Sequence, residues 1–169
     1  METITSKIDS SNISFLQFLI IFICFFLNII DGMDVLVISY TAPVIASSWD
    51  ISFEALGVVF SSGVLGMAIG ALLLAPYADK IGRKKIILIS TIIISIGILL
   101  TGFSANIYHL IFLRFLSGIG IGTMLASTVS LVSEYTPNRS RDFWVSFILA
   151  GYPIGCLLYT SDAADELLG

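Results

Sequence analysis

The chain has 169 residues, of which 57% are hydrophobic and 12% are charged, and its mean hydropathy is +1.01. A soluble domain carries about twice that share of charged residues, so the composition argues against a water-soluble enzyme or binding module and indicates an integral membrane protein. The formal charge is -4, so acidic residues outnumber basic ones. This leaves no electrostatic basis for binding nucleic acid. Two cysteines and one histidine cannot supply a tetrahedral metal site, so we expect neither a metal nor a cofactor.

The apolar runs predict an all-α transmembrane chain, because backbone polar groups inside a bilayer must be satisfied within a helix. Residues 1–14 are polar and are predicted to form a cytoplasmic tail. Four complete spans and part of a fifth are expected to follow. We place them at residues 15–45, 54–77, 86–103, 110–132 and from residue 143 onward.

The basic residues predict the orientation of these spans, because Lys and Arg near helix ends are retained on the cytoplasmic side. With a cytoplasmic N-terminus, seven of the eight bases fall on that side, namely Lys7, Lys80, Arg83, Lys84, Lys85, Arg139 and Arg141. The loops on the other side, residues 46–53 and 104–109, contain none. We therefore expect a multi-pass protein with its N-terminus in the cytoplasm.

Small residues at helical spacing predict close packing between spans, since helix association inside lipid depends on backbones approaching each other. Gly66 and Gly70 lie one turn apart in the second span, and Gly118 and Gly122 do so in the fourth. We expect each of these helices to present a smooth face to a neighbour, and we assign the glycines a packing role.

Two acidic residues, Asp31 and Asp34, stand in the middle of the first span. A carboxylate at the centre of a bilayer costs at least about 2.5 kcal/mol, so acids in such positions are functional by default. Residues three apart share one face of a helix, so the pair is expected to point into a cavity. Two close carboxylates are not both ionised easily in a low dielectric, and such a pair can take up and release a proton. The alternative interpretation is a break between two helical segments, loosened by Gly32.

Arg114 is a further charge inside a predicted span. Its guanidinium stays protonated and needs an anionic partner, for which the candidates are an aspartate of the first span or a substrate carboxylate. Alternatively, Arg114 lies close enough to the outer end of its helix for its charge to reach the membrane interface. Tyr40 and Tyr152 could line a cavity with their hydroxyls or serve only in helix packing.

The short loop between the second and third predicted spans reads Ala75-Pro-Tyr-Ala-Asp-Lys-Ile-Gly-Arg-Lys-Lys85. It resembles the loop signature G-x-x-x-D-R-x-G-R-K of the major facilitator superfamily, with Ala75 in place of glycine and Lys80 in place of arginine. In that family the loop works as a cytoplasmic latch between the two halves of a carrier. The resemblance implies a gating role for Asp79, Lys80, Gly82, Arg83 and Lys84.

Further segments resemble signatures of the same superfamily. Arg114-Phe-Leu-Ser-Gly-Ile-Gly-Ile-Gly122 is similar to the fourth-helix signature, whose arginine is associated with proton coupling. Gly151-Tyr-Pro-Ile-Gly155 is similar to the opening of the fifth-helix signature. Asp31-Gly-Met-Asp34, followed by Ala42-Pro43, resembles the first helix of the aromatic acid/proton symporter group, in which an aromatic residue usually stands at the position of Met33.

The resemblance implies a symporter of the bacterial inner (plasma) membrane that imports a small organic acid, with Asp31, Asp34 and Arg114 binding the proton and the substrate. Its partners would be the lipid bilayer, the organic acid, protons and the missing C-terminal half of the carrier. The alternatives are a sugar importer or drug exporter of the same superfamily, or a non-transporting membrane scaffold fragment. No catalytic motif of a hydrolase or protease appears, so we expect a carrier and not an enzyme.

The last residues, Cys156-Leu-Leu-Tyr-Thr-Ser-Asp-Ala-Ala-Asp-Glu166, read unlike a membrane segment and resemble the translation of a sequencing adapter. We therefore predict a cytoplasmic tail at residues 1–14, a partial transmembrane bundle at residues 15–155 and a non-native tail at residues 156–169. The alternative is a natural polar C-terminus, which would leave a fifth span of about 16 residues, short for a bilayer.

Overall fold

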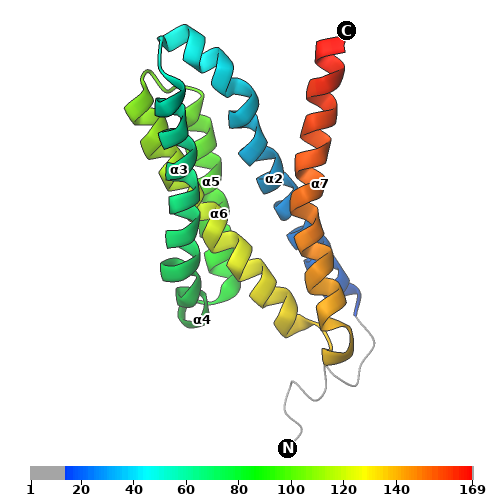
Figure 1. Cartoon of the computed structure of the whole chain (residues 1–169). Helices are drawn as coiled ribbons and strands as arrows, with labels where there is room; N and C mark the ends of the chain where they lie inside the picture. The colour runs from blue at the N-terminus through cyan, green and yellow to red at the C-terminus, as the bar shows by residue number, and fades with distance from the viewer. Residues whose placement is uncertain (1–13, 169) are drawn as a thin grey trace, which may run out of the picture. The chain divides into compact units, whose positions relative to one another are not determined.

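The computed structural model describes residues 14–168, with side chains through residue 160, and the elements in this range are all helices. The long helices are α2 (Phe15–Trp49), α3 (Phe53–Ile69), α5 (Arg83–Thr101), α6 (Ile107–Tyr135) and α7 (Arg141–Leu168), as Figure 1 shows. The short ones are the π-helix η1 (Gly70–Leu74), α4 (Ala78–Ile81) and the 3₁₀ helices η2 (Ala75–Tyr77) and η3 (Asn138–Ser140). The predicted all-α class is confirmed for the described residues, whereas the predicted cytoplasmic tail lies outside them except for Ser14.

Five helical segments of the described chain are long and apolar enough to cross a membrane. They are Phe15–Trp49, Phe53–Ile81, Arg83–Thr101, Ile107–Tyr135 and Asn138–Thr160. Each of the five has large exposed apolar or aromatic side chains, which can face lipid. The fifth segment has 23 residues, which is enough for a bilayer, because it begins at Asn138, before the predicted start at residue 143, and extends to Thr160. The chain is therefore a multi-pass integral membrane protein.

The first of these segments, α2, is one uninterrupted α-helix of 35 residues with Pro43 inside it. Asp31, Gly32 and Asp34 are all helical. The alternative interpretation, in which the acidic pair marks a break between two helices, is therefore wrong. The apolar residues on both sides favour this outcome, because a broken helix would leave backbone groups without hydrogen bonds in lipid.

The second span begins regularly and ends irregularly. Ser52 precedes α3, and its hydroxyl oxygen accepts a hydrogen bond from the backbone N–H of Ala55, as a helix N-cap does. At the other end, α3 passes through η1 into η2, which contains Pro76. Proline has no N–H to donate to the carbonyl four residues earlier, so the regular α-helical bonding pattern cannot continue through this position.

The described chain forms two compact units. The first unit contains α2 up to Val37, the end of α6 from Thr128 onward, and α7, whereas the second unit is Ile38–Ser127. Each unit has its own apolar core. The core of the first is built on Ile21, Cys24, Val132 and Ile148. The core of the second includes Ile38, Val59 and Leu110.

Within the second unit, α6 packs against both α3 and α5, and the three helices run side by side in Figure 1. The hydroxyl of Ser62 on α3 donates a hydrogen bond to the carbonyl oxygen of Ile111 on α6 at 3.2 Å. On the other side, Gly97 of α5 lies against Ser117 of α6. The small residues on α6 thus let it approach two neighbours at once.

Candidate functional site

The two acids of the first span are buried in the structure. Asp31 is 2% exposed and Asp34 is 6% exposed, and both belong to the first unit. They lie three residues apart on the uninterrupted helix α2, so they share one face of it, and their carboxyl groups interact electrostatically. A buried acidic pair of this kind is costly in a membrane.

Tyr152 on α7 belongs to the same site. Its phenol group interacts electrostatically with both Asp31 and Asp34. The sequence left open whether Tyr152 lines a polar site or only packs, and the structure places it beside the acids within the first unit. A tyrosine hydroxyl can both donate and accept a hydrogen bond. Tyr152 can therefore donate to an ionised carboxylate or accept from a protonated carboxyl.

Glycines hold α2 and α7 close together at this level. A β-carbon added at Gly32 would collide with the carbonyl oxygen of Tyr152, and one added at Gly155 would collide with that of Ile29. The thiol of Cys156 donates a weak hydrogen bond to the carbonyl oxygen of Gly32, with the sulfur 3.4 Å from that oxygen. These backbone contacts position the ring of Tyr152 relative to the acids.

Arg114 lies on α6 in the second unit and is 8% exposed. Its carbonyl oxygen accepts a hydrogen bond from the hydroxyl of Ser117 at 3.2 Å. The structure brings Asp31, Asp34 and Tyr152 together within one unit. The pairing of Arg114 with an aspartate or a substrate carboxylate stays a prediction.

The four glycines assigned to packing all lie where the second span, α3 continuing into η1, contacts α6. A β-carbon added at Gly66 or Gly70 would collide with a carbonyl oxygen of α6, and one added at Gly118 or Gly122 would collide with a carbonyl oxygen of α3. The backbone atoms involved belong to Phe115, Ile119, Gly63 and Met67, respectively. Contact this close requires residues without a side chain.

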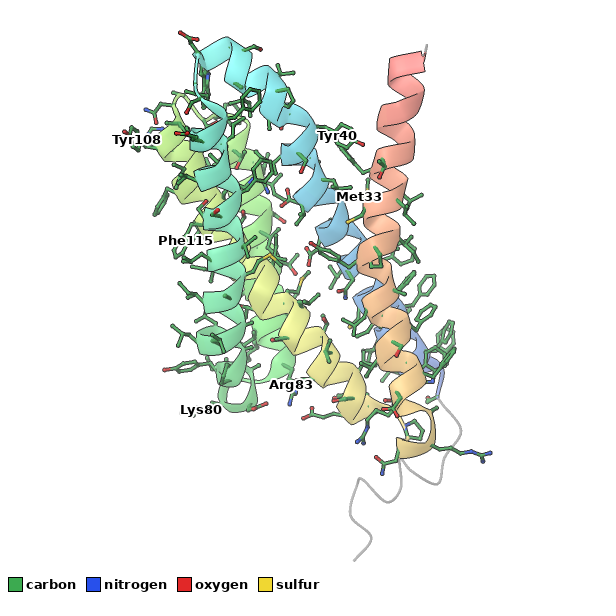
Figure 2. All side chains as sticks on the ribbon, viewed as in Figure 1. Met33, Tyr40, Lys80, Arg83, Tyr108 and Phe115 are labelled. Carbon is green, nitrogen blue, oxygen red and sulfur yellow. The ribbon has the colours of Figure 1, made fainter. Side chains whose placement is uncertain are left out.

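The segment around α4 carries the charged loop motif. The guanidinium of Arg83 forms an ion pair with the carboxylate of Asp79 at 2.8 Å. Gly82 has φ = 100° and ψ = 130°, a conformation that essentially only glycine adopts. The ammonium nitrogen of Lys80 lies 5.6 Å from the ring centroid of Tyr77, within the range of a cation–π interaction, and Lys84 is exposed. Figure 2 shows Lys80 and Arg83 at the turn between the second and third spans.

The second unit also has an apolar groove of about 420 Å³ between α3 and α6. Tyr108 and Phe115, both labelled in Figure 2, contribute to its wall. The other lining residues are Val58, Ser61, Ser62, Leu65, Ile111 and Phe112. Since no lining residue is charged, the groove offers no ion pair to a substrate carboxylate.

Asn28 was not selected from the sequence, although it is 1% exposed and lies one turn before Asp31 on α2. The signal that could have found it is simple: Asn28 is a polar residue inside an apolar run, three positions from an acid. Gly151 of α7 lies against it, because a β-carbon added there would be 3.2 Å from the β-carbon of Asn28.

These features define a class of protein: a polytopic membrane protein with ionisable side chains buried inside its spans and a charged glycine-containing loop between two of them. The sequence profile of the Major Facilitator Superfamily matches residues 21–161. The chain belongs to this family.

Curated relatives of the chain are named as transporters of aromatic acids. The chain is 39% identical to the gallate transporter of Pseudomonas putida over 148 residues, which are 88% of this chain and 33% of that protein. It is 36% identical to the 4-hydroxybenzoate transporter PcaK of Acinetobacter baylyi, over 88% of this chain and 32% of the relative. It is 32% identical to the benzoate transport protein of the same species, over 90% of this chain and 34% of the relative. The chain thus spans about a third of the length of these relatives.

Proposed function

We propose that the chain is the N-terminal part of a proton-coupled carrier that imports a small organic acid, with an aromatic carboxylate as the substrate class. The observation that carries the proposal is the buried pair Asp31 and Asp34 inside a membrane-spanning helix, with Tyr152 beside it. The names of the relatives, which transport gallate, 4-hydroxybenzoate and benzoate, support this class of substrate.

In this proposal the acidic pair carries the coupling proton. Two carboxylates that interact in a low-dielectric medium do not both stay ionised easily, so one of them takes up a proton and releases it on the other side of the membrane. Arg114 stays positively charged and meets the carboxylate of the substrate or of an aspartate. A carrier of this kind requires a second half, which we assign to the part of the relatives that the chain does not span.

We further propose that the motif around α4 gates the cytoplasmic side of the carrier. The ion pair between Asp79 and Arg83 and the backbone conformation of Gly82 give this segment a defined shape, while Lys80 and Lys84 present positive charge. The same bases support a cytoplasmic N-terminus. Together with the bacterial sources of the relatives, they favour the bacterial inner membrane as the location.

The domain boundaries remain proposals: a tail at residues 1–14, a bundle at residues 15–155 and a non-native segment at residues 156–169. The family match extends to residue 161, so the boundary near Cys156 needs a direct test. Sequencing the source DNA across the codon for Cys156 provides it. A frame that departs from the present sequence there supports a non-native tail, whereas an identical sequence through residue 169 contradicts it.

Uptake by the full-length carrier tests the function. Cells that express it are expected to accumulate radiolabelled benzoate, 4-hydroxybenzoate or gallate, and a protonophore is expected to abolish the accumulation. Asp31→Asn and Asp34→Asn each remove one ionisable group, so each is expected to reduce uptake at least tenfold. The matched control is Asp50→Asn, because Asp50 is exposed and has φ = 50°, a conformation that asparagine also adopts readily.

The result that contradicts the proposal is uptake that is insensitive to the protonophore, or equal activity of Asp31→Asn and Asp50→Asn. Uptake of a sugar, or export of a drug, would favour another carrier of the same family. Absence of any flux in correctly inserted full-length protein would favour a scaffold role.

A further inference from the structure

The amide of Asn28 has a fixed orientation. Its Nδ2 donates a hydrogen bond to the carbonyl oxygen of Cys24 at 2.8 Å, one turn earlier on α2. The reversed amide would place two acceptor oxygens against each other, so hydrogen bonding assigns the nitrogen to this position. The amide oxygen Oδ1 consequently faces away from Cys24. It is buried and has no hydrogen-bond partner among the residues that the structure describes.

The carboxyl group of Asp31 has the same feature as the amide of Asn28. Its Oδ2 is also buried and has no hydrogen-bond partner in the described part of the chain. A buried acceptor left unpaired costs about 1–3 kcal/mol. Asn28 and Asp31 are three residues apart on one helix, where β-carbons lie roughly 5–6 Å from each other, so the two side chains are neighbours.

A single proton on Asp31 would give both of these buried oxygens a hydrogen-bond partner. An ionised Asp31 presents only acceptors, so its Oδ2 and the Asn28 Oδ1 would both stay unpaired. A protonated Asp31 presents one O–H donor. We infer that Asn28 is the hydrogen-bond acceptor for the protonated carboxyl of Asp31, with Oδ2–H donating to Oδ1, and that Asn28 thereby holds the coupling proton at this level of the membrane. This inference rests on the proposed proton coupling and adds a positioning residue to it.

Other titratable groups around Asp31 do not replace Asn28. On α2 the neighbour is Asp34, and on α7 the neighbouring groups are Tyr152, which interacts electrostatically with Asp31, and Cys156, which interacts with Tyr152. None of the described residues donates to Asn28 Oδ1.

The end of α6 that belongs to the first unit carries Glu134 and Tyr135. The carbonyl oxygen of Tyr135 accepts a hydrogen bond from Gln17. Gln17 lies fourteen residues before Asp31 on α2, a separation of about 21 Å along a helix. These two groups are therefore at another depth of the membrane.

The test uses a matched pair of substitutions, Asn28→Thr and Asn28→Val, in the purified full-length carrier reconstituted in lipid. Threonine and valine have the same shape and leave the same space, but only threonine retains an acceptor oxygen. The readout is the C=O stretching band of the protonated Asp31 carboxyl in pH-difference infrared spectra, identified by its loss in Asp31→Asn. A carboxyl that loses a hydrogen bond absorbs at higher frequency.

We expect the band of Asn28→Thr to stay near that of the unsubstituted carrier and the band of Asn28→Val to move to higher frequency. Loss of the acceptor disfavours the protonated form, so the midpoint of the titration in Asn28→Val is expected about one pH unit lower than in Asn28→Thr. Equal bands and equal midpoints in the two variants would overturn the inference. If neither variant folds, the unsubstituted carrier decides, because a band at the frequency of a carboxyl without a hydrogen bond overturns it as well.

Uptake measured on the same samples separates this inference from the proposed function. A difference between the threonine and valine variants without proton-driven uptake supports the hydrogen bond and contradicts the carrier. Proton-driven uptake with identical spectra in the two variants contradicts the role of Asn28 alone.

Discussion

Gly32 of α2 lies against the carbonyl oxygen of Tyr152 on α7, with no space for a side chain between them. Gly32 directly follows Asp31 in the acidic motif, and Tyr152 is the α7 residue that interacts electrostatically with both acids. Because Gly32 has no β-carbon, α7 can approach α2 closely here. This close approach places the side chain of Tyr152 beside the acidic pair.

Substitution of Gly32 by alanine is expected to destabilise the first unit by about 1–3 kcal/mol, as overpacking of a tight contact does. Unfolding in mixed micelles, followed by circular dichroism, measures the change. The control is Gly57→Ala, because a β-carbon at Gly57 meets nothing within 4 Å, and alanine favours a helix over glycine. A loss at position 32 no larger than that at position 57 would show that the contact with Tyr152 is not tight.

The contact between α3 and α6 predicts an asymmetry between two facing glycines. A β-carbon at Gly118 would collide with the carbonyl of Gly63, whereas a β-carbon at Gly63 would lie 3.8 Å from the carbonyl oxygen of Arg114, an ordinary contact. Gly118→Ala is therefore expected to lower stability by about 1–3 kcal/mol, and Gly63→Ala is expected to be neutral or slightly stabilising. Thermal unfolding of the two variants in the same detergent compares them directly, and equal melting temperatures would count against this packing.

In the charged loop, the backbone of Gly82 is expected to matter more for stability than the ion pair beside it. Alanine at a position with φ = 100° is strained by about 1–3 kcal/mol. The Asp79 side chain is 66% exposed, and an exposed ion pair contributes at most about 1 kcal/mol. Gly82→Ala should thus lower the unfolding midpoint more than Asp79→Asn does.

A second glycine provides the control for this comparison. Gly102 has an ordinary helical conformation with φ = -64°, so Gly102→Ala is expected to have little effect. If Gly82→Ala behaves like Gly102→Ala, the loop does not depend on the conformation found here.

The hydroxyl of Tyr152 is expected to contribute to transport by the full-length carrier. Tyr152→Phe keeps the ring and its packing but removes the group that interacts with Asp31 and Asp34. Loss of a polar group beside buried carboxyls costs about 1–3 kcal/mol, so uptake is expected to fall about tenfold. Tyr108→Phe serves as the control, because Tyr108 is 78% exposed. Initial uptake rates, normalised to the amount of inserted protein, give the comparison, and equal rates would exclude a role for the hydroxyl.

Much of the fold could be predicted from the sequence because a bilayer restricts the backbone so strongly. Apolar runs must be helices in lipid, so the five spans appear at the predicted places, with ends that differ by a few residues. The spacing of Gly118 and Gly122 likewise indicated a face suited to close helix contact. The helix that faces them could not be predicted, because spacing within one helix carries no information about its partner.

The candidate site was predictable in part for the same reason. Asp31 and Asp34 stand out because charge in an apolar run is rare and costly. Asn28 was missed and the role of Tyr152 was left open, because an amide or a phenol in a span is tolerated for many reasons. Their importance depends on burial and on the neighbours they meet, which are properties of the folded chain.

The sequence by itself determined that this protein crosses a membrane several times and carries an acidic pair within its first span, since both follow from local chemistry and the cost of charge in lipid. Only the tertiary structure decided that Gly32, Gly151 and Gly155 join α2 to α7 and that Asn28 is sealed beside Asp31 with an acceptor oxygen unpaired among the described residues. The physical reason is distance along the chain: the glycine contacts join residues more than a hundred positions apart, and only close packing of the two helices determines which atoms meet and which polar side chains are buried.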